Sequence, residues 1–373
     1  MVAASGGVWA QQAYPVKVGA VLPLSGARAS VGAAQRVALE ESVAALRSDG
    51  ITLSLTLIDA RSVSETEAAD LVRDLVASGV HALICCNTPA EAAQLAPVAA
   101  AAALPLLTLA PLPASPNETT WVFSLAAEEV RVLERLLLEP ALHPVGLMAP
   151  VGPVGDHAAA LLESVLLAPV RSSAARYPDD PAAPLTPEAL LLATRGPASV
   201  VLWDGGAGSV RAAEALAARG YEGDVIVRRE VWTELGALGR AGLTGAKSVV
   251  SPALLGYTLA DTHPSKGSTS SFRRALVGLP GAPTMAVLEL AARAWDAALL
   301  LGLATEQVLT YLDADPDADP ATLRSALRDA LVGLEPTDGA GGRYDFGEGS
   351  PNGLEPGSLV LAVWRGGQFR PGP

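Results

Sequence analysis

Polar residues follow a short apolar run that we expect to be a strand, and their chemistry suits the binding of a small anion. The run ends at Cys86 and leads into Asn87 and Thr88, with Pro89 at the expected first position of a helix. A helix N-terminus presents N–H groups without intrahelical partners and favours a carboxylate. Asn87 and Thr88 are therefore candidate ligand groups. Alternatively, Thr88 only caps the helix and Glu91 folds back onto it as a capping box.

Two further strand ends carry side chains that could face a ligand. Trp203 and Asp204 precede the glycines of a strand-to-helix turn, and they either face a ligand or only form that turn. At the next strand end, the acid Glu230 would pair with a cation, whereas Arg229 would hold a carboxylate through two hydrogen bonds. Trp232 is the next candidate at this end. The choice between acid and arginine largely decides the ligand class.

The sequence motifs of hydrolases, metal sites and calcium loops are not found. No G-x-S-x-G marks a hydrolase, and we expect neither a cofactor nor a metal. The histidines lack Cys or carboxylate neighbours at metal-ligand spacing; they are His81, His143, His157 and His263. An alternating acidic run lacks the central glycine and terminal glutamate of a calcium loop, so we expect a solvated loop. It comprises Asp313, Asp315, Asp317 and Asp319.

The two cysteines, Cys85 and Cys86, are adjacent in the chain. A disulfide between neighbours closes no long loop, so the pair does not reveal the redox compartment. We expect both side chains to pack at the buried end of a strand, and a disulfide between them is the less expected alternative.

The elements that must position these residues follow from length and patterning. The chain has 373 residues, of which 50% are hydrophobic and 17% charged, and it supports about two folded domains. Short apolar runs alternate with helical patterns, which is typical of parallel sheets covered by helices. The first doubly wound unit has strands at 16–22, 52–59, 82–85 and 104–109, with helices at 33–47, 65–78 and 89–103. The second has strands near 121–124, 144–149, 168–171, 198–203, 224–228 and 247–250.

Charge and the N-terminus constrain partners and location. A formal charge of −13 argues against nucleic acid and anionic lipid. Residues 1–13 end in a pattern like the end of a secretory signal, so we expect a signal remnant or a disordered N-terminus. Prolines interrupt the apolar stretch 92–114, which therefore predicts a helix, a turn and a strand rather than a membrane span.

Local motifs along nearly the whole chain resemble the type I periplasmic solute-binding proteins of ATP-driven importers, in the branched-chain amino acid binding family. Lys17–Gly26 (KVGAVLPLSG) is similar to the opening "VGxxxPLSG" segment of that family, and 90–111 to its helix and strand ending in proline. Near the C-terminus, Ala291–Ala297 (AARAWDA) and Gly339–Phe346 (GAGGRYDF) resemble two further motifs, followed by GGQF. The shared order and spacing carry the resemblance.

The resemblance implies an α/β fold of two doubly wound, Rossmann-like lobes joined by three hinge crossings, with a ligand in the cleft between them. Lobe 1 would comprise 14–118 and 253–342, and lobe 2 would comprise 119–252 and 343–373. The crossings would lie near 115–121, 250–255 and 340–360.

The resemblance also implies ligand residues at particular strand ends. Relatives place backbone groups for a ligand carboxylate at positions matched by Ala110 and Leu112, and the first loop, with Ser25, could approach the ligand closely. Val154 stands where relatives carry an aromatic pocket residue. Glu230 is matched to the acid that pairs with a ligand ammonium.

The expected function is that of an exported solute-binding component of an ABC importer. It would bind a small amino acid or related carboxylate, close by hinge motion, present the closed form to an inner-membrane permease, and act as a monomer without catalysis. One alternative is a cytoplasmic ligand sensor of the same fold, for example an amide or amino acid receptor. Another is an α/β enzyme.

Overall fold

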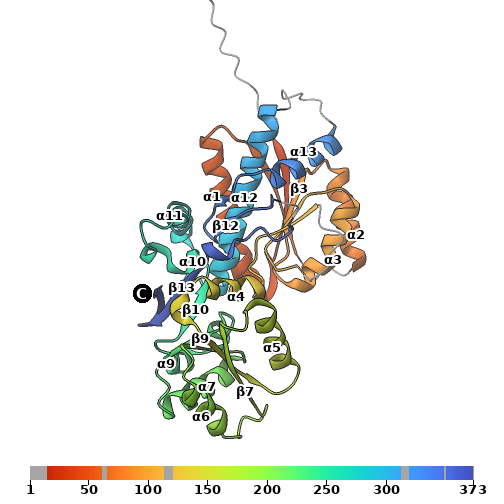
Figure 1. Cartoon of the computed structure of the whole chain (residues 1–373). Helices are drawn as coiled ribbons and strands as arrows, with labels where there is room; N and C mark the ends of the chain where they lie inside the picture. Colours follow the sequence, from red (N-terminus) through yellow and green to blue (C-terminus); the bar gives the residue numbers. More distant parts are fainter. Residues whose placement is uncertain (1–14, 61–64, 113–120, 312–318, 348–349, 373) are drawn as a thin grey trace, which may run out of the picture.

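A computed structural model describes residues 15–60, 65–112, 121–311, 319–347 and 350–372. The chain forms two lobes, one above the other in Figure 1. Our expectations for residues 1–13 and for the aspartates from Asp313 to Asp317 fall outside the described residues. The predicted mixed α/β fold with parallel sheets in two lobes is confirmed.

The first lobe is built on a five-stranded parallel sheet in the order β2-β1-β3-β4-β5. Strand β1, which lies between β2 and β3, is buried at every position but Lys17, as expected for a parallel strand covered on both faces. The strands are β1 (Val16–Leu22), β2 (Leu53–Asp59), β3 (Ala82–Cys85), β4 (Leu106–Thr108) and β5 (Val122–Ser124).

Helices cover both faces of this sheet, with α1 and α12 side by side on one face and α2 and α3 on the other (Figure 1). The helices of this lobe are α1 (Ala29–Ser48), α2 (Glu65–Ala77), α3 (Pro89–Ala101), α10 (Pro252–Leu255), α11 (Lys266–Ala275), α12 (Met285–Tyr311) and α13 (Pro320–Val332). The polar sequence of α11 buries little besides Thr269 and Phe272, which explains why apolar periodicity does not reveal this helix.

The second lobe holds a seven-stranded sheet in the order β14-β13-β10-β9-β8-β6-β7, in which β13 and β14 run antiparallel to their neighbours. Its strands are β6 (Val145–Pro150), β7 (Arg171–Tyr177), β8 (Ser199–Leu202), β9 (Asp224–Val227), β10 (Lys247–Val250), β13 (Val360–Arg365) and β14 (Gln368–Pro371). Its helices are α4 (Glu129–Leu137), α5 (Pro153–Val165), α6 (Thr186–Arg195), α7 (Gly206–Ala218), α8 (Val231–Glu234) and α9 (Ala237–Gly242).

Three segments differ from the sequence expectation. The strand predicted near 121–124 belongs to the first sheet rather than the second, because β5 pairs with β4. Asn352 forms a bridge to the outer side of this strand at Ser124, so the stretch around 352 also lies beside the first sheet. The predicted strand at 168–171 lies instead at β7, whose polar outer side suits an edge strand and hides it from a search for apolar runs. The remaining lobe boundaries stay a proposal.

Two of the motifs that carry the family resemblance meet inside the fold. Asp296 of α12 accepts hydrogen bonds from the backbone N–H groups of Ala340 (2.6 Å) and Gly341 (2.7 Å), and from the Tyr344 hydroxyl (2.8 Å). A Cβ added at Gly339 would come within 2.5 Å of the Asp296 carboxyl group. This glycine-rich loop, between β11 (Thr337–Asp338) and β12 (Arg343–Tyr344), therefore needs small residues to approach the buried acid.

Candidate functional site

A cavity of about 450 Å³ opens at the C-terminal ends of β1 and β3 in the first lobe. These strands flank the point where the strand order reverses, which is where open α/β sheets bind ligands. The cavity includes the predicted ligand residues Ser25 and Thr88. It is lined by Val21, Pro23, Ser25, Ala27, Arg28, Ala60, Cys86, Thr88, Ala90, Glu91, Gln94 and Leu95.

The turn into α3 is capped by Thr88, as one alternative from the sequence predicts, but Glu91 folds back onto Asn87, one residue earlier than in a capping box. The Glu91 backbone N–H donates to the Thr88 hydroxyl (3.2 Å), and the Asn87 backbone N–H donates to the Glu91 carboxylate (2.6 Å). The Asn87 N–H, one residue before the N-cap, is therefore already satisfied by the Glu91 side chain. A contact of Asn87 or Thr88 with a ligand stays a prediction.

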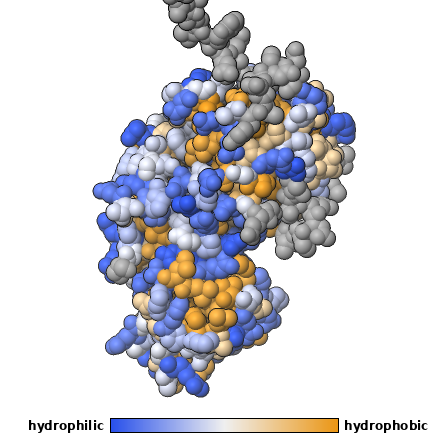
Figure 2. Space-filling model, turned by 45° about the horizontal axis from the view of Figure 1, so that its top comes forward, coloured by the Kyte–Doolittle hydropathy of each residue, from blue (hydrophilic) through white to orange (hydrophobic). Residues whose placement is uncertain are grey.

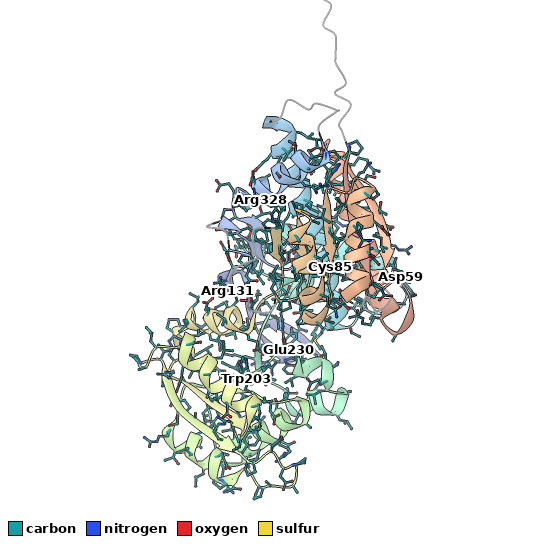
Figure 3. The ribbon with its side chains drawn as sticks, turned by 90° about the vertical axis from the view of Figure 1, so that its right-hand side faces the viewer. Asp59, Cys85, Arg131, Trp203, Glu230 and Arg328 are labelled. Atoms are coloured by element: carbon teal, nitrogen blue, oxygen red, sulfur yellow. A yellow bond between two sulfur atoms is a disulfide. The ribbon has the colours of Figure 1, made fainter. Side chains whose placement is uncertain are left out.

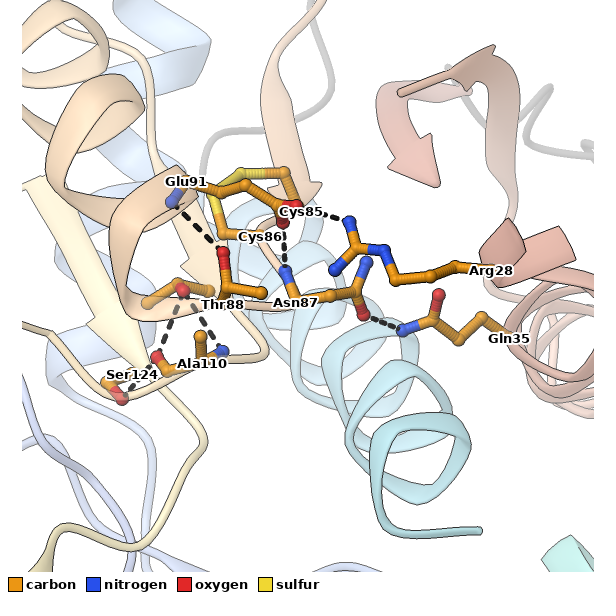
Figure 4. The surroundings of a disulfide bond; sticks show 10 residues. Arg28, Gln35, Cys85, Cys86, Asn87, Thr88, Glu91, Ala110 and Ser124 are labelled. Atoms are coloured by element: carbon orange, nitrogen blue, oxygen red, sulfur yellow. Dashed lines mark hydrogen bonds and ion pairs between the residues drawn. A yellow bond between two sulfur atoms is a disulfide. The ribbon is translucent and has the colours of Figure 1, made fainter. Parts of the chain in front are cut away.

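Two side chains from other elements, Arg28 and Gln35, contact this turn. Arg28, in the short 3₁₀ helix η1 (Gly26–Arg28), forms an ion pair with Glu91, and Gln35 of α1 donates a hydrogen bond to the side chain of Asn87 (Figure 4). The backbone N–H of Ser25 donates to the Asp59 carboxylate (3.1 Å), which fixes the first loop against the end of β2. The Arg28 side chain is 40% exposed, so it can reach a ligand.

The cysteine pair differs from the expectation of simple packing, because Cys85 and Cys86 form a disulfide. Both residues are buried, as expected, but Cys86 also lines the cavity. Its φ of 69° lies in the left-handed region, which residues with a Cβ rarely adopt. The sequence alone cannot reveal this bond, since two adjacent thiols are also compatible with plain burial.

The backbone groups expected at the end of β4 are already engaged. The Ala110 N–H donates to the Thr108 hydroxyl (3.2 Å), and the Ala110 carbonyl accepts from Thr108 (3.0 Å) and Ser124 (3.3 Å). Ala110 itself is buried, so it supports the strand end rather than presenting a free donor. Leu112 is half-buried at the boundary of the described residues, and its contact with a ligand stays a prediction.

Trp203 lies at the end of β8 under charged side chains of the second lobe. The Arg228 guanidinium stacks over its ring, 4.9 Å from the centroid, and the His157 ring meets it edge to face at 6.4 Å. Arg228 also donates to Glu129 (3.1 Å), and His157 contacts the same carboxylate (2.7 Å). Figure 3 shows Trp203 and Glu230 in the upper part of the second lobe, below the first lobe.

Glu230 and its neighbour Arg229 have different surroundings. Glu230 lies 2.8 Å from Arg229 and 3.7 Å from Arg228, and its side chain is 45% exposed against 16% for Arg229. Burial alone would raise the pKa of Glu230, but the two guanidinium groups hold it below its ordinary value. Both groups are thus charged, and Glu230 is the more accessible of the two.

Arg229 points instead toward the first lobe. It donates to the carbonyl of Ala127 (3.4 Å) and lies 3.9 Å from Glu289 of α12. Glu289 in turn lies 3.8 Å from Arg293, which donates to the carbonyl of Leu109 at the end of β4 (2.8 Å). Burial lowers the pKa of Arg229, but Glu289 and Glu230 outweigh it and raise that pKa above the ordinary value. These charges link the two lobes.

The other predicted second-lobe residues fall into three situations. Trp232 is fully buried beside Trp364 and Phe369 and donates to Ser248 (2.7 Å), so the structure places it in the core and not at a ligand. Asp204 accepts from the Tyr177 hydroxyl (2.6 Å) and the Gly205 N–H (2.7 Å), which stabilises its own turn.

Val154 is 51% exposed at the start of α5. An apolar group there is accessible, but no described contact assigns it to the site. Figure 2 shows apolar surface gathered on the second lobe just below the constriction between the lobes.

Sequence reasoning misses several charged residues of this region. Arg28 and Glu91 meet from separate elements, as do Arg228 and Glu129, and His157 approaches Trp203 from α5. No local spacing brings these pairs together. Arg28 could have been suspected because it follows the Ser25 loop closely, but nothing in the sequence signals Glu129.

Residues 15–60, 65–112, 121–311, 319–347 and 350–372 were also considered as a metal site or a membrane span would require them. Within those ranges, no three His, Cys, Asp or Glu side chains gather as a metal site would require. None of the helices in the described part of the chain has the length and apolar character needed to span a bilayer.

The two-lobed fold, with polar and charged residues at the strand ends of both lobes, defines the class of the protein as a two-lobed binding protein. A model of the periplasmic binding protein family matches residues 15–367, and the chain therefore belongs to this family. The resemblance inferred from the motifs is thus confirmed. Among curated proteins, no sequence matches the chain significantly.

Solved structures share the fold at low sequence identity. An extracellular ligand-binding receptor from Rhodopseudomonas palustris HaA2 is 20% identical, with a TM-score of 0.64 and coverage of 96% of this chain and 100% of that one. An ABC transporter substrate-binding protein from Desulfitobacterium hafniense, in complex with Leu, is 18% identical with a TM-score of 0.67, covering 96% and 99%. A branched-chain amino acid transporter substrate binding protein from Streptococcus pneumoniae, in complex with isoleucine, is 14% identical with a TM-score of 0.59, covering 95% and 97%.

Proposed function

We propose that the protein is the extracytoplasmic solute-binding component of an ABC importer and binds a small amino acid or related carboxylate between its lobes. The observation that carries this proposal is the position of Glu230, ionised and accessible at the end of β9, opposite a lobe whose cavity contains Arg28. An ammonium group suits Glu230 and a carboxylate suits Arg28. Family membership supports the same function.

The protein binds without catalysis, and the ligand acts as the link between two rigid halves. A ligand held by both lobes stabilises the closed arrangement over the open one by the difference in its contacts with each. The inner-membrane permease then recognises the closed form of a monomer. The paired charges of Arg229, Glu289 and Arg293 lie where the halves meet and keep that junction ordered.

A thermal-shift panel of amino acids, aromatic acids, amides and sugars tests the proposal, together with mass spectrometry of any compound released on denaturation. A ligand at about 100 times its dissociation constant adds about 2.7 kcal/mol of apparent stability. No shift with any compound and no released metabolite would contradict binding of a small solute.

The role of Glu230 is tested by Glu230→Gln. The variant should bind an ammonium-bearing ligand at least tenfold more weakly, because truncating one member of a charge pair typically costs 2 kcal/mol or more. A simple carboxylate without an ammonium should bind nearly as before. Glu222→Gln, an exposed position before β9, is the matched control and should leave both affinities unchanged. Equal losses for both ligand types would overturn the assignment.

A further inference from the structure

The Cys85–Cys86 disulfide lies between the first-lobe sheet and the cavity. Cys85 is the last residue of β3, and its carbonyl accepts from the Leu109 N–H (2.9 Å), which ties it to the neighbouring strand end. Cys86 is the next residue, and it lines the cavity. Both are almost completely buried, and of the two only Cys86 lines the cavity.

Arg28 and Glu91 form a charged wall of the cavity, and Asn87, the residue after the disulfide, contacts this wall. Cys86 has a φ of 69°, and this orientation aims the next N–H, that of Asn87, at the Glu91 carboxylate (2.6 Å). Glu91 in turn forms the ion pair with Arg28 (Figure 4). The backbone conformation at Cys86 is therefore connected, through the Asn87 N–H, to the Glu91 carboxylate and its partner Arg28.

We propose that the Cys85–Cys86 disulfide is a redox switch that holds this wall of the ligand cavity in its binding arrangement. With the sulfur atoms joined, Cys86 keeps its left-handed conformation and the Asn87 N–H stays on Glu91. Once they are separated, Cys86 returns to the extended region that residues with a Cβ prefer, and the Asn87–Glu91 hydrogen bond is lost. The effect on ligand affinity rests on the proposed function.

The co-reactant is a dithiol, such as that of a thiol–disulfide oxidoreductase. One of its thiolates attacks the Cys86 sulfur from the cavity, forms a mixed disulfide, and releases the Cys85 thiolate, which takes a proton. The second thiol of the co-reactant then displaces Cys86 and forms the co-reactant's own disulfide. Two electrons and two protons pass to the protein, which is left with two thiols.

Ligand and reductant compete in this arrangement. A ligand in the cavity covers the Cys86 sulfur, so it slows reduction. If the ligand also binds the oxidised form more tightly than the reduced form, it stabilises the disulfide by the same factor, because coupling between two equilibria is reciprocal.

The experiment uses the full chain purified without reductant. Its two cysteines are its only thiol source, so alkylation with iodoacetamide after denaturation reports the disulfide directly. We expect no label before reduction and two labels after treatment with dithiothreitol. Hydrogen exchange of a peptide spanning 82–95 should then be at least tenfold faster in the reduced protein, while a peptide from β8 in the second lobe is unchanged.

The double variant Cys85→Ser, Cys86→Ser is the control. Without reductant it should match the exchange of the reduced wild type and should not respond to dithiothreitol. If this variant does not fold, the comparison of wild type before and after reduction decides alone. Two labels before any reduction, or unchanged exchange after complete reduction, would overturn the proposal.

A separate arm tests the coupling to ligand, with L-leucine as the probe. If L-leucine raises the melting temperature, it should slow labelling by dithiothreitol and iodoacetamide at least tenfold, and equal rates would overturn the coupling. If no compound of the panel shifts the melting temperature, the proposed function fails, while the labelling and exchange results still decide the switch.

Discussion

The charged residues at the strand ends of both lobes are already paired with one another. A ligand that binds there must replace these ion pairs with contacts of its own. Glu91 is held by Arg28, whose side chain is 40% exposed, and Glu230 is held by Arg228 and Arg229. Ion pairs at such partly exposed positions typically contribute about 0–1 kcal/mol. A ligand carrying both charges can therefore exchange with them at little cost, so the internal pairs are compatible with binding.

The buried acid Asp296 should make the stability of the protein depend on pH. Burial raises its pKa from 3.8 to about 7, although the N–H groups of Gly341 and Ala340 and the Tyr344 hydroxyl act in the opposite direction. Between these two values the folded chain binds more protons at this site than the unfolded chain does. Its contribution to stability is therefore complete below pH 3.8 and is lost as the pH rises through 7.

Asp296→Asn removes this titration. The variant should be less stable than the wild type at pH 5, and the difference should shrink by about 3 kcal/mol between pH 5 and pH 8. Urea denaturation of both proteins at each pH measures it. A difference that stays constant with pH would show that Asp296 titrates at its ordinary value.

His81 gives a pH dependence of the opposite sign. Burial lowers its pKa from 6.5 to about 4, helped by the charges of Lys17 and Arg324, and its Nδ1 accepts from the Lys17 backbone N–H (3.0 Å). The folded chain thus binds fewer protons than the unfolded chain between these values, and stability is lost as the pH falls through this window. Between pH 7 and pH 4, His81→Asn should lose about 3 kcal/mol less than the wild type, because Asn keeps an acceptor but does not titrate. Parallel loss in both would contradict this.

At the scale of elements, the stability of α3 depends on its first turn. The Thr88 hydroxyl accepts the Glu91 N–H (3.2 Å), and Thr88→Ala removes that acceptor. We expect a loss of about 1 kcal/mol in the free energy of unfolding, measured by urea denaturation. Thr88→Ser keeps the hydroxyl and should stay within a few tenths of the wild type. If the two variants lost the same stability, the methyl group and not the cap would be the cause.

The sequence predicts elements well where apolar periodicity is strong and poorly where an element is polar. The pattern around β1 and α3 indicates both, because a buried parallel strand and a capped helix each leave a local signal. It does not indicate α11, which is polar, and it places β7 too early because the outer side of that edge strand is polar. Nor does it assign β5 to its sheet, since periodicity says nothing about which strand pairs with which.

The sequence predicts those residues of the candidate site that lie at the end of one strand. Ser25 and Thr88 do line the cavity, and Glu230 is accessible at the end of its strand. Trp232 follows only two residues later, yet it is turned into the core because α8 begins between them. The pairing of Arg28 with Glu91 depends on the tertiary fold, which no local spacing encodes.

At the scale of the whole molecule, charged contacts and hydrophobic packing cross between the lobes together. One continuous hydrophobic cluster includes Leu107 of the first sheet and Val201 and Ile226 of the second. Glu289 lies at the same junction, close to both Arg229 and Arg293. If the lobes close on a ligand as proposed, these contacts across the junction should persist, so closure should change the gap between the lobes and leave each lobe intact.

Solution scattering tests this motion. A single compact body of this length would have a radius of gyration of about 21 Å, and two lobes with an open gap should exceed that value. Saturation with the ligand from the thermal-shift panel should lower the radius, because a ligand with contacts to both lobes favours the closed arrangement. Glu230→Gln at the same ligand concentration should stay at the larger radius if its affinity has fallen enough to leave the site largely empty. An unchanged radius in a saturated wild-type protein would mean that the lobes bind the ligand without closing, and hinge closure would then be wrong although binding stands.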